Sequence, residues 1–327
     1  MTGATGYIGG RLIPRLLEAG HRVRAMARDP HDLQKMSWVD DVEVVTADLT
    51  DPDSLAKAFT GIDVVYYLVH SMGSSTDFSS AEAESANHTV TAARRADVGR
   101  FVYLGGLHPR TGELSAHLKS RTTVGDTLID SGIETVVLQA GVVIGAGSAS
   151  YEMIRLLTVA LPVLPVPTWT NHLVQPIAVD DVLHYLVASA TADLPGSRTW
   201  DVGGPNVLRY RDMLGDFAEE AGLSRRRFVP VPLVTPSLST RGIAFLTPMS
   251  PDLVRPLVES LRHDAVMKDR DIDTIIAPPP RGLSTYRTSI RRALRQPGTT
   301  DDGALAARPD AATLLTTDPS WAHHGRR

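Results

Sequence analysis

The hydrophobic positions of the first two hundred residues follow two periodicities in alternation. Apolar, β-branched runs of strand length lie at 21–28, 42–49, 63–69, 100–106 and 134–145. The stretches between them have a helical character, at 7–19, 52–60, 79–97 and 115–131. Nearly continuous apolar strands separated by amphipathic helices are typical of a parallel sheet covered on both faces. With right-handed crossovers, the pattern predicts an α/β fold with a Rossmann-type, doubly wound parallel sheet.

The pattern changes after Gly145. Prolines in "LPVLPVPTW" (161–169) exclude a helix or a central strand, which predicts a surface connection. We expect one Rossmann domain at 1–145, to which 173–205 return as a strand, a helix and another strand. We expect a small, mostly helical C-terminal lobe from 146–172 and 206–295. The tail 296–327 is rich in Gly, Ala, Asp, Pro and Thr, which predicts disorder.

Composition narrows the possible chemistry. The chain has 327 residues, no cysteine and a net charge of −4, which excludes disulfides and thiolate metal sites and gives no general attraction to nucleic acid. His323 and His324 are adjacent but lack further ligands, so we predict no metal. No apolar run reaches the roughly 20 residues that span a bilayer. We therefore expect a cytoplasmic protein without an integral membrane segment, and the sequence does not indicate its oligomeric state.

A basic stretch near the C-terminal end allows two interpretations. In 286–296, four arginines would lie along one side of a helix, opposite Ile290 and Leu294: Arg287, Arg291, Arg292 and Arg295. The favoured interpretation is a solvated helix face. The weaker alternative is contact with an anionic membrane surface or an acidic partner.

A glycine-rich turn opens the chain. In "TGATGYIGG", Gly3 permits a tight turn, Gly6 lets the backbone approach a phosphate, and Gly9 allows close packing of helix and strand. A helical run follows at once, and a strand ending in Arg28 comes about twenty residues later. This spacing predicts a dinucleotide site. Only Met1 precedes the turn, although such a turn follows a strand, so we expect the natural chain to begin earlier with one more central strand.

The residue at the end of the second strand predicts which dinucleotide binds. Where an acidic residue would hold the ribose 2′-hydroxyl of NAD, this chain has Arg28, with Arg24 as a possible helper. A guanidinium binds a phosphate through two hydrogen bonds. We therefore predict NADP as the cofactor, with NAD as the alternative, and a solvated strand-end arginine as the simpler interpretation of Arg28.

The chain resembles an extended or atypical short-chain dehydrogenase/reductase, near the NmrA-like and complex-I-accessory-subunit-like branches. Beyond the glycine turn, the resemblance depends on "ADLTD" (47–51), "DVVYYLVHS" (63–71), "RFVYLGG" (100–106), "GVVIGAGS" (141–148), "QPIAVDDV" (175–182) and "DVGGP" (201–205). It implies that Asp48 and Leu49 border the adenine, although Asp48 also fits a turn cap. It implies that Leu68, Val69 and His70 line the ribose and nicotinamide side. The complete set of expected cofactor-binding residues is Gly3, Thr5, Gly6, Tyr7, Ile8, Gly9, Arg28, Asp48, Leu49, Leu68, Val69, His70 and Lys119.

The residues that carry the family's proton transfer are missing. Catalytic members use a Tyr-x-x-x-Lys pair, in which the tyrosine transfers the proton and the lysine lowers its pKa. The aligned stretch here begins with Ser115 and ends with Lys119, and the usual serine region reads Leu104-Gly105-Gly106-Leu107. Ser115 and Lys119 remain the candidate catalytic residues. Other candidates for the proton are His70, His108, His117 and Tyr151.

Three functions therefore stay open. The first is an NADP(H)-dependent reductase of a small or lipophilic carbonyl or a quinone-like compound. The second is a non-catalytic NADP(H)-binding sensor or assembly factor, and the third is a nucleotide-sugar epimerase or dehydratase. We expect the substrate pocket between the strand ends and the lobe, with walls from 151–162, 171–176 and 237–260.

Overall fold

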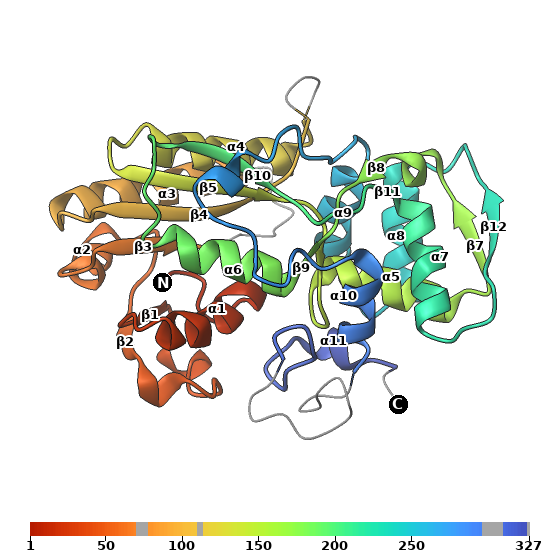
Figure 1. The fold of residues 1–327 in the computed structure, drawn as a ribbon, viewed down its shortest axis with the longest axis horizontal. Helices are drawn as coiled ribbons and strands as arrows, with labels where there is room; N and C mark the ends of the chain where they lie inside the picture. The colour runs from red at the N-terminus through yellow and green to blue at the C-terminus, as the bar shows by residue number, and fades with distance from the viewer. Residues whose placement is uncertain (70–77, 110–113, 296–309, 326–327) are drawn as a thin grey trace.

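The computed structural model describes residues 1–69, 78–109, 114–295 and 310–325. Its main sheet has four parallel strands in the order β10-β5-β4-β3 (Figure 1). The strands are β3 (Val64–Tyr67), β4 (Arg100–Gly106), β5 (Glu134–Ala140) and β10 (Arg198–Val202). A separate parallel pair consists of β1 (Arg24–Ala27) and β2 (Glu43–Thr46). The predicted α/β, Rossmann-type fold class is confirmed.

The first two residues lie between β1 and β3. The Met1 carbonyl accepts a hydrogen bond from the Met26 amide at 3.0 Å, and the Thr2 amide donates to the Tyr66 carbonyl at 3.0 Å. These bonds connect the two groups of strands, so the glycine turn that follows lies at the carboxyl edge of the sheet.

Helices cover both faces of the main sheet. On one face lie α3 (Phe78–Arg95) and α4 (Ala116–Ile129), with α2 (Pro52–Phe59) beside α3; on the other lie α1 (Tyr7–Glu18) and α6 (Val179–Ser189) (Figure 1). Each face buries its own apolar cluster, one with Leu12, Leu138 and Trp200, the other with Leu55, Phe101 and Leu128. Both faces of β4 and β5 are therefore dry, as their continuous apolar sequences predict.

The remaining elements form a lobe with a third apolar cluster of its own. Its helices are α5 (Ala149–Ala160), α7 (Tyr210–Glu220), α8 (Pro236–Leu246), α9 (Pro251–Ser260) and α10 (Tyr286–Ala293). Short pairs of strands join it to the rest: β6 (Val143–Ile144) with β9 (Ile177–Ala178), and β8 (Leu173–Val174) with β11 (Leu208–Arg209). The domain division itself stays a prediction.

The expected surface connection at 161–169 contains a strand, which corrects the prediction. Within it, β7 (Val163–Val166) pairs in parallel with β12 (Arg227–Pro230). Pro165 is accommodated because the ribbon has only two strands, so one side of each strand needs no ladder partner.

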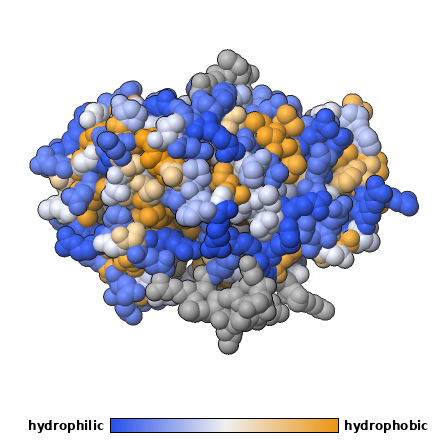
Figure 2. Space-filling model, in the orientation of Figure 1, coloured by the Kyte–Doolittle hydropathy of each residue, from blue (hydrophilic) through white to orange (hydrophobic). Residues whose placement is uncertain are grey.

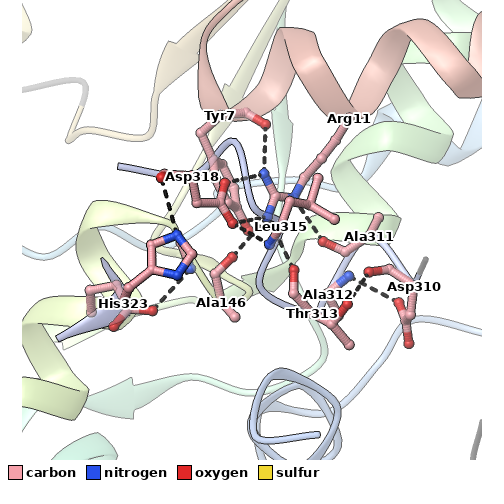
Figure 3. A network of polar contacts seen from close by, with 12 residues as sticks. Tyr7, Arg11, Ala146, Asp310, Ala311, Ala312, Thr313, Leu315, Asp318 and His323 are labelled. Carbon is pink, nitrogen blue, oxygen red and sulfur yellow. Dashed lines mark hydrogen bonds and ion pairs between the residues drawn. The ribbon is translucent and has the colours of Figure 1, made fainter. Parts of the chain in front are cut away.

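The tail was predicted to be disordered, and this is wrong for residues 310–325. The segment lies against α1 and the lobe, and it ends with the short helix α11 (Ser320–His323). The Arg11 guanidinium on α1 forms an ion pair with Asp318 at 2.7 Å, and both side chains are only 3% exposed. The same guanidinium donates to the carbonyls of Ala146, Ala311 and Thr313 (Figure 3). Residues 296–309 lie outside the described part.

The arginines of α10 bind carboxylates of the chain itself. Arg287 contacts Asp216, Glu219 and Glu220 on α7, and Arg291 contacts Glu220. Arg292 bridges Asp180 and Asp310. Ile290, which the sequence places opposite the arginines, is buried. Because these positive charges are balanced internally, the structure argues against the weaker expectation that 286–296 contact a membrane. Among the described residues, no helix is both long and apolar enough to cross a membrane.

Candidate functional site

The glycine turn has the geometry that a dinucleotide site needs. Gly3 has φ +68°, and its carbonyl accepts a hydrogen bond from the Gly6 amide at 3.0 Å. A Cβ on Gly9 would lie 2.1 Å from the Gly3 oxygen, so no larger residue fits there. The close packing expected at Gly9 is present, and its partner is the turn itself.

The first turn of α1 is left open toward an anion. Gly6 is the N-cap residue, so no side chain caps the helix, and the first turn contains no acidic residue. The free amide groups and the helix dipole make such an end a binding site for phosphate. The residues therefore fit the pyrophosphate of a dinucleotide.

A cleft of about 670 Å³ runs from this turn along the strand ends. Its volume is within the roughly 300–1,000 Å³ of ligand pockets. Of the described residues predicted to bind cofactor, all line it except Lys119. Their individual roles stay predictions, and His70 lies outside the described residues.

The cleft also contains residues that the sequence did not identify. They are Met26, Ala27, Asp32, Ala47, Thr50, Ser85 and Leu104. Ala27, Ala47 and Thr50 are next to predicted residues at the ends of strands, so their positions could have been inferred from those neighbours. Ser85 reaches the cleft from α3, and no motif marks a helix residue of this kind.

Arg28 and Arg24 have different environments. Arg28 follows β1 directly, is exposed at the cleft, and has no hydrogen bond or ion pair with any residue that the structure describes. Arg24 binds Glu43 at 2.9 Å and donates to the carbonyls of Ala58 and Thr60. Arg24 is therefore not available to help, which corrects that expectation, and Arg28 remains as the free guanidinium at this position.

Asp48 caps a turn, as one of the two interpretations expects, and it also lines the cleft. Its carboxylate accepts hydrogen bonds from the Thr50 amide at 2.9 Å and the Thr50 hydroxyl at 2.8 Å, which is a turn cap. These bonds, together with the positive charge of Arg28, hold the pKa of Asp48 below its usual value. The residue nevertheless lines the cleft beside Leu49, so the turn presents it to a ligand in a fixed position.

Ser115 and Lys119 do not form a catalytic pair in the described geometry. The Ser115 hydroxyl caps α4 by accepting the Leu118 amide at 3.3 Å. Lys119 is exposed on the first turn of α4, and it is not among the described residues that line the cleft. A helix cap explains why a serine is present at this position without any role in proton transfer.

Three other candidates for proton transfer, which the structure describes, also lie away from the cleft wall. His108 contacts Thr122 and Gln139, at 3.1 Å and 3.0 Å. Burial and the neighbouring Arg121 lower the pKa of His117 to about 4, so His117 is neutral at pH 7. Tyr151 is fully buried in the lobe against the ring of Phe217, so its hydroxyl cannot reach a substrate in the cleft.

The lining residues themselves offer little acid–base chemistry. Burial raises the pKa of the Tyr7 hydroxyl, which lies close to Gly145, where a Cβ would be 2.4 Å away. The pKa of Asp48 is lowered, so both groups are shifted away from neutrality. None of the lobe segments expected as pocket walls, 151–162, 171–176 and 237–260, lines the described cleft. This cleft is the cofactor end of the site, so the walls of the substrate end stay a prediction.

Comparison with known proteins supports this site. Residues 3–155 match a family of domains described as NAD(P)H-binding. A ceramide reductase from Caulobacter vibrioides is 29% identical over 191 residues, which are 58% of this chain and 59% of that protein. Uncharacterized mycobacterial proteins match at 27% identity over 212 residues, and the chain spans about a fifth of their length, 22%.

Solved structures share the fold across most of the chain. Triphenylmethane reductase from a Citrobacter species has a TM-score of 0.70 and 17% identity, covering 90% of this chain and 98% of that one. The same reductase has been solved with NADP(H). An NADPH-dependent quinone oxidoreductase from Escherichia coli has a TM-score of 0.69 and 16% identity, covering 90% and 99%. The chain therefore has an NAD(P)H-binding domain and shares the Rossmann-type fold of these reductases, as the resemblance to atypical short-chain dehydrogenase/reductases implies. The NmrA-like branch stays a prediction.

Proposed function

We propose that this relative of the atypical short-chain dehydrogenase/reductases is an NADP(H)-dependent reductase of a small or lipophilic carbonyl or quinone-like compound. The observation that carries the proposal is the cleft, which joins an uncapped helix N-terminus to an exposed, unpaired Arg28 among the described residues. Reductases of dyes, quinones and ceramides among the similar proteins support the direction of the reaction. A cytoplasmic location is part of the proposal.

The residues of the cleft would divide the cofactor between them. The amides of α1 hold the pyrophosphate, and Arg28 binds the 2′-phosphate through its planar fork of donors. The turn at Asp48 and Leu49 borders the adenine, while Leu68 and Val69 exclude water beside the nicotinamide. When bound, NADPH supplies the hydride.

A second function is favoured by a specific observation. Ser115 caps a helix, and the pKa values of Tyr7 and Asp48 in the cleft are shifted away from neutrality, so a non-catalytic NADP(H)-binding sensor or assembly factor is the alternative. A sensor must discriminate NADP⁺ from NADPH, because only differential affinity shifts a conformational equilibrium. A nucleotide-sugar epimerase or dehydratase stays the third candidate.

Loss of NADPH absorbance against a panel of carbonyls and quinones separates the first two functions. A reductase oxidises NADPH with at least one acceptor, and Gly6→Asp at the phosphate turn abolishes this by placing a carboxylate where the pyrophosphate binds. Ser115→Tyr then changes turnover, because a phenol near Lys119 supplies a proton donor. Ser115→Thr is the control, since threonine keeps the helix cap.

Calorimetry with both redox forms completes the test. Absence of oxidation across the panel, together with different affinities for NADP⁺ and NADPH, would replace the reductase with the sensor. Equal affinities and no turnover would reject both.

A further inference from the structure

Helix α8 in the lobe has its apolar side turned toward solvent. Its buried positions include the polar Ser239 and Thr240, and the Ser239 hydroxyl accepts a hydrogen bond from the Trp169 indole at 3.1 Å. Its outward stripe contains Leu238, Phe245 and Leu246, which are 55%, 89% and 43% exposed. A helix of a globular protein normally buries the larger apolar side chains. This arrangement indicates that something else covers the outer stripe.

The exposed apolar surface continues from α8 onto the neighbouring ribbon. Leu233, in the connection that precedes α8, is 92% exposed. The Val231 amide donates to the Val166 carbonyl, which fixes this connection beside β7. Val163 on β7 and Phe228 and Val229 on β12 are also exposed. We call this surface, made by 163–166 and 225–246, the lobe-end face. In Figure 2 hydrophobic side chains gather at the right-hand end of the molecule, where Figure 1 places β7 and β12.

The charge of the lobe-end face has a single sign. From Ser224 to Ser250 the chain has four arginines and no acidic residue. Arg225, Arg227 and Arg241 are exposed, and within the described structure they make no ion pair. The arginines of α10, in contrast, all lie in a helix whose positive charges are largely matched by carboxylates of α7, α6 and the tail. The protein therefore keeps unbalanced positive charge beside its exposed apolar side chains.

The exposed apolar side chains and the unbalanced positive charge together favour one kind of partner. A second copy of the chain is disfavoured, because a two-fold contact would place the same arginines against each other. An anionic bilayer satisfies both, since apolar side chains enter the boundary of headgroups and acyl chains while arginines meet lipid phosphates. Leu233 and Phe245 project singly from the surface, which suits insertion into a fluid interface more than docking into a rigid groove.

We propose that the lobe-end face binds the surface of an anionic membrane, with Leu233 and Phe245 inserted and Arg225, Arg227 and Arg241 on lipid phosphates. This inference is independent of the proposed reductase function, because the face lies outside the described cleft.

Co-sedimentation of the full-length protein with vesicles tests the proposal. Wild type should pellet with vesicles of phosphatidylcholine and phosphatidylglycerol and stay in solution with phosphatidylcholine alone. Replacing the three arginines with serine should weaken binding about fivefold per arginine, the equivalent of about 1 kcal/mol each. High salt should weaken wild-type binding in the same direction. Leu233→Ser with Phe245→Ser should also release the protein, because no apolar side chain then enters the lipid.

Matched controls come from the opposite part of the molecule. Val44 on β2 is an exposed apolar residue and Arg22 an exposed arginine, so Val44→Ser and Arg22→Ser should leave binding unchanged. Cofactor affinity and melting temperature verify that every variant is folded. The proposal is overturned if wild type ignores phosphatidylglycerol vesicles, or if the controls weaken binding as much as the lobe-end variants. It is also overturned if light scattering shows a dimer that the Leu233 and Phe245 substitutions dissociate.

Discussion

Arg28 is the residue from which a cofactor preference follows. It stands exposed at the cleft with no hydrogen bond or ion pair in the described structure, and the charge of Asp48 acts on it. Arg24, in contrast, is held by Glu43 and two carbonyls. A guanidinium without an internal partner has donors left for a 2′-phosphate. NADH has a neutral hydroxyl in place of this phosphate, so Arg28 gains no charged partner when NADH binds.

We therefore expect NADPH to bind more tightly than NADH, and Arg28→Ala to reduce the difference by about 1–3 kcal/mol. Isothermal calorimetry with both cofactors measures the change. Arg24→Ala is the matched control, because its loss should lower stability without changing the preference. Equal affinities of the wild type for NADPH and NADH would contradict the prediction.

Single residues also show where the sequence was informative and where it was not. The glycine turn, Arg28 and Asp48 could be predicted because backbone conformation and charge at strand ends depend on local sequence. Ser85 could not, since its place in the cleft depends on how α3 lies across the sheet. Arg24 looked equivalent to Arg28, and only the positions of Glu43 and α2 distinguish them.

At the scale of elements, the C-terminal segment 310–325 contains the buried ion pair between Asp318 and Arg11, besides the more exposed pair between Asp310 and Arg292. Arg11 has its guanidinium 4.0 Å from the centre of the Tyr7 ring, and its partner Asp318 also accepts the Leu315 amide at 2.7 Å. Both charges are desolvated, so removing one of them strands the other in a medium of low dielectric constant. Removing one of the two charges should therefore lower the free energy of unfolding strongly, whereas replacing both with apolar residues should lower it much less.

We expect Arg11→Met to lower the free energy of unfolding by about 3–5 kcal/mol, and Asp318→Leu by a similar amount. The double variant should lose much less than the sum of the two, because neither charge is then left alone. Urea unfolding of the wild type, the two single variants and the double variant measures the coupling free energy between Arg11 and Asp318. Arg15→Met on the same helix is the control: its pair with Asp180 is half exposed, so its loss should cost at most about 1 kcal/mol. Additive losses would show that the pair is not coupled.

The elements that the sequence predicted are those with a clear periodicity. The predicted runs 100–106 and 115–131 correspond to β4 and α4 with small differences at the ends. The segment 310–325 was missed because its small apolar residues, such as Ala311 and Ala312, carry no periodic signal. Its anchor, Arg11, is 307 positions away from Asp318. The β7–β12 ribbon was missed because prolines argue against strands, and only its pairing shows that the edges are free.

At the scale of the whole molecule, α1 connects the cofactor site to the lobe. Its first turn faces the cleft, and one turn later Arg11 binds the carbonyl of Ala146, at the start of the lobe, together with the C-terminal segment (Figure 3). A ligand that fixes the N-terminus of α1 therefore restrains an element that both parts of the protein contact. Binding at the cleft should stabilise residues far from it.

Hydrogen exchange with and without NADPH tests this connection. A ligand at a concentration of one hundred times its dissociation constant adds about 2.7 kcal/mol to the free energy of unfolding of every segment that unfolds together with the binding site. In the wild type, we expect the slowly exchanging amides of β4 and of α7 in the lobe to gain protection by similar amounts.

In Arg11→Met, the gain should remain in β4 and largely disappear from α7, because the variant lacks the contacts that join α1 to Ala146 and Asp318. Arg15→Met, on the same helix, should behave as the wild type, since it removes only the partly exposed pairs of Arg15 with Asp180 and Glu18. If α7 gained as much protection in Arg11→Met as in the wild type, the two parts would be coupled by other contacts, such as the short strand pair β6–β9, and Arg11 would serve only to hold the C-terminal segment.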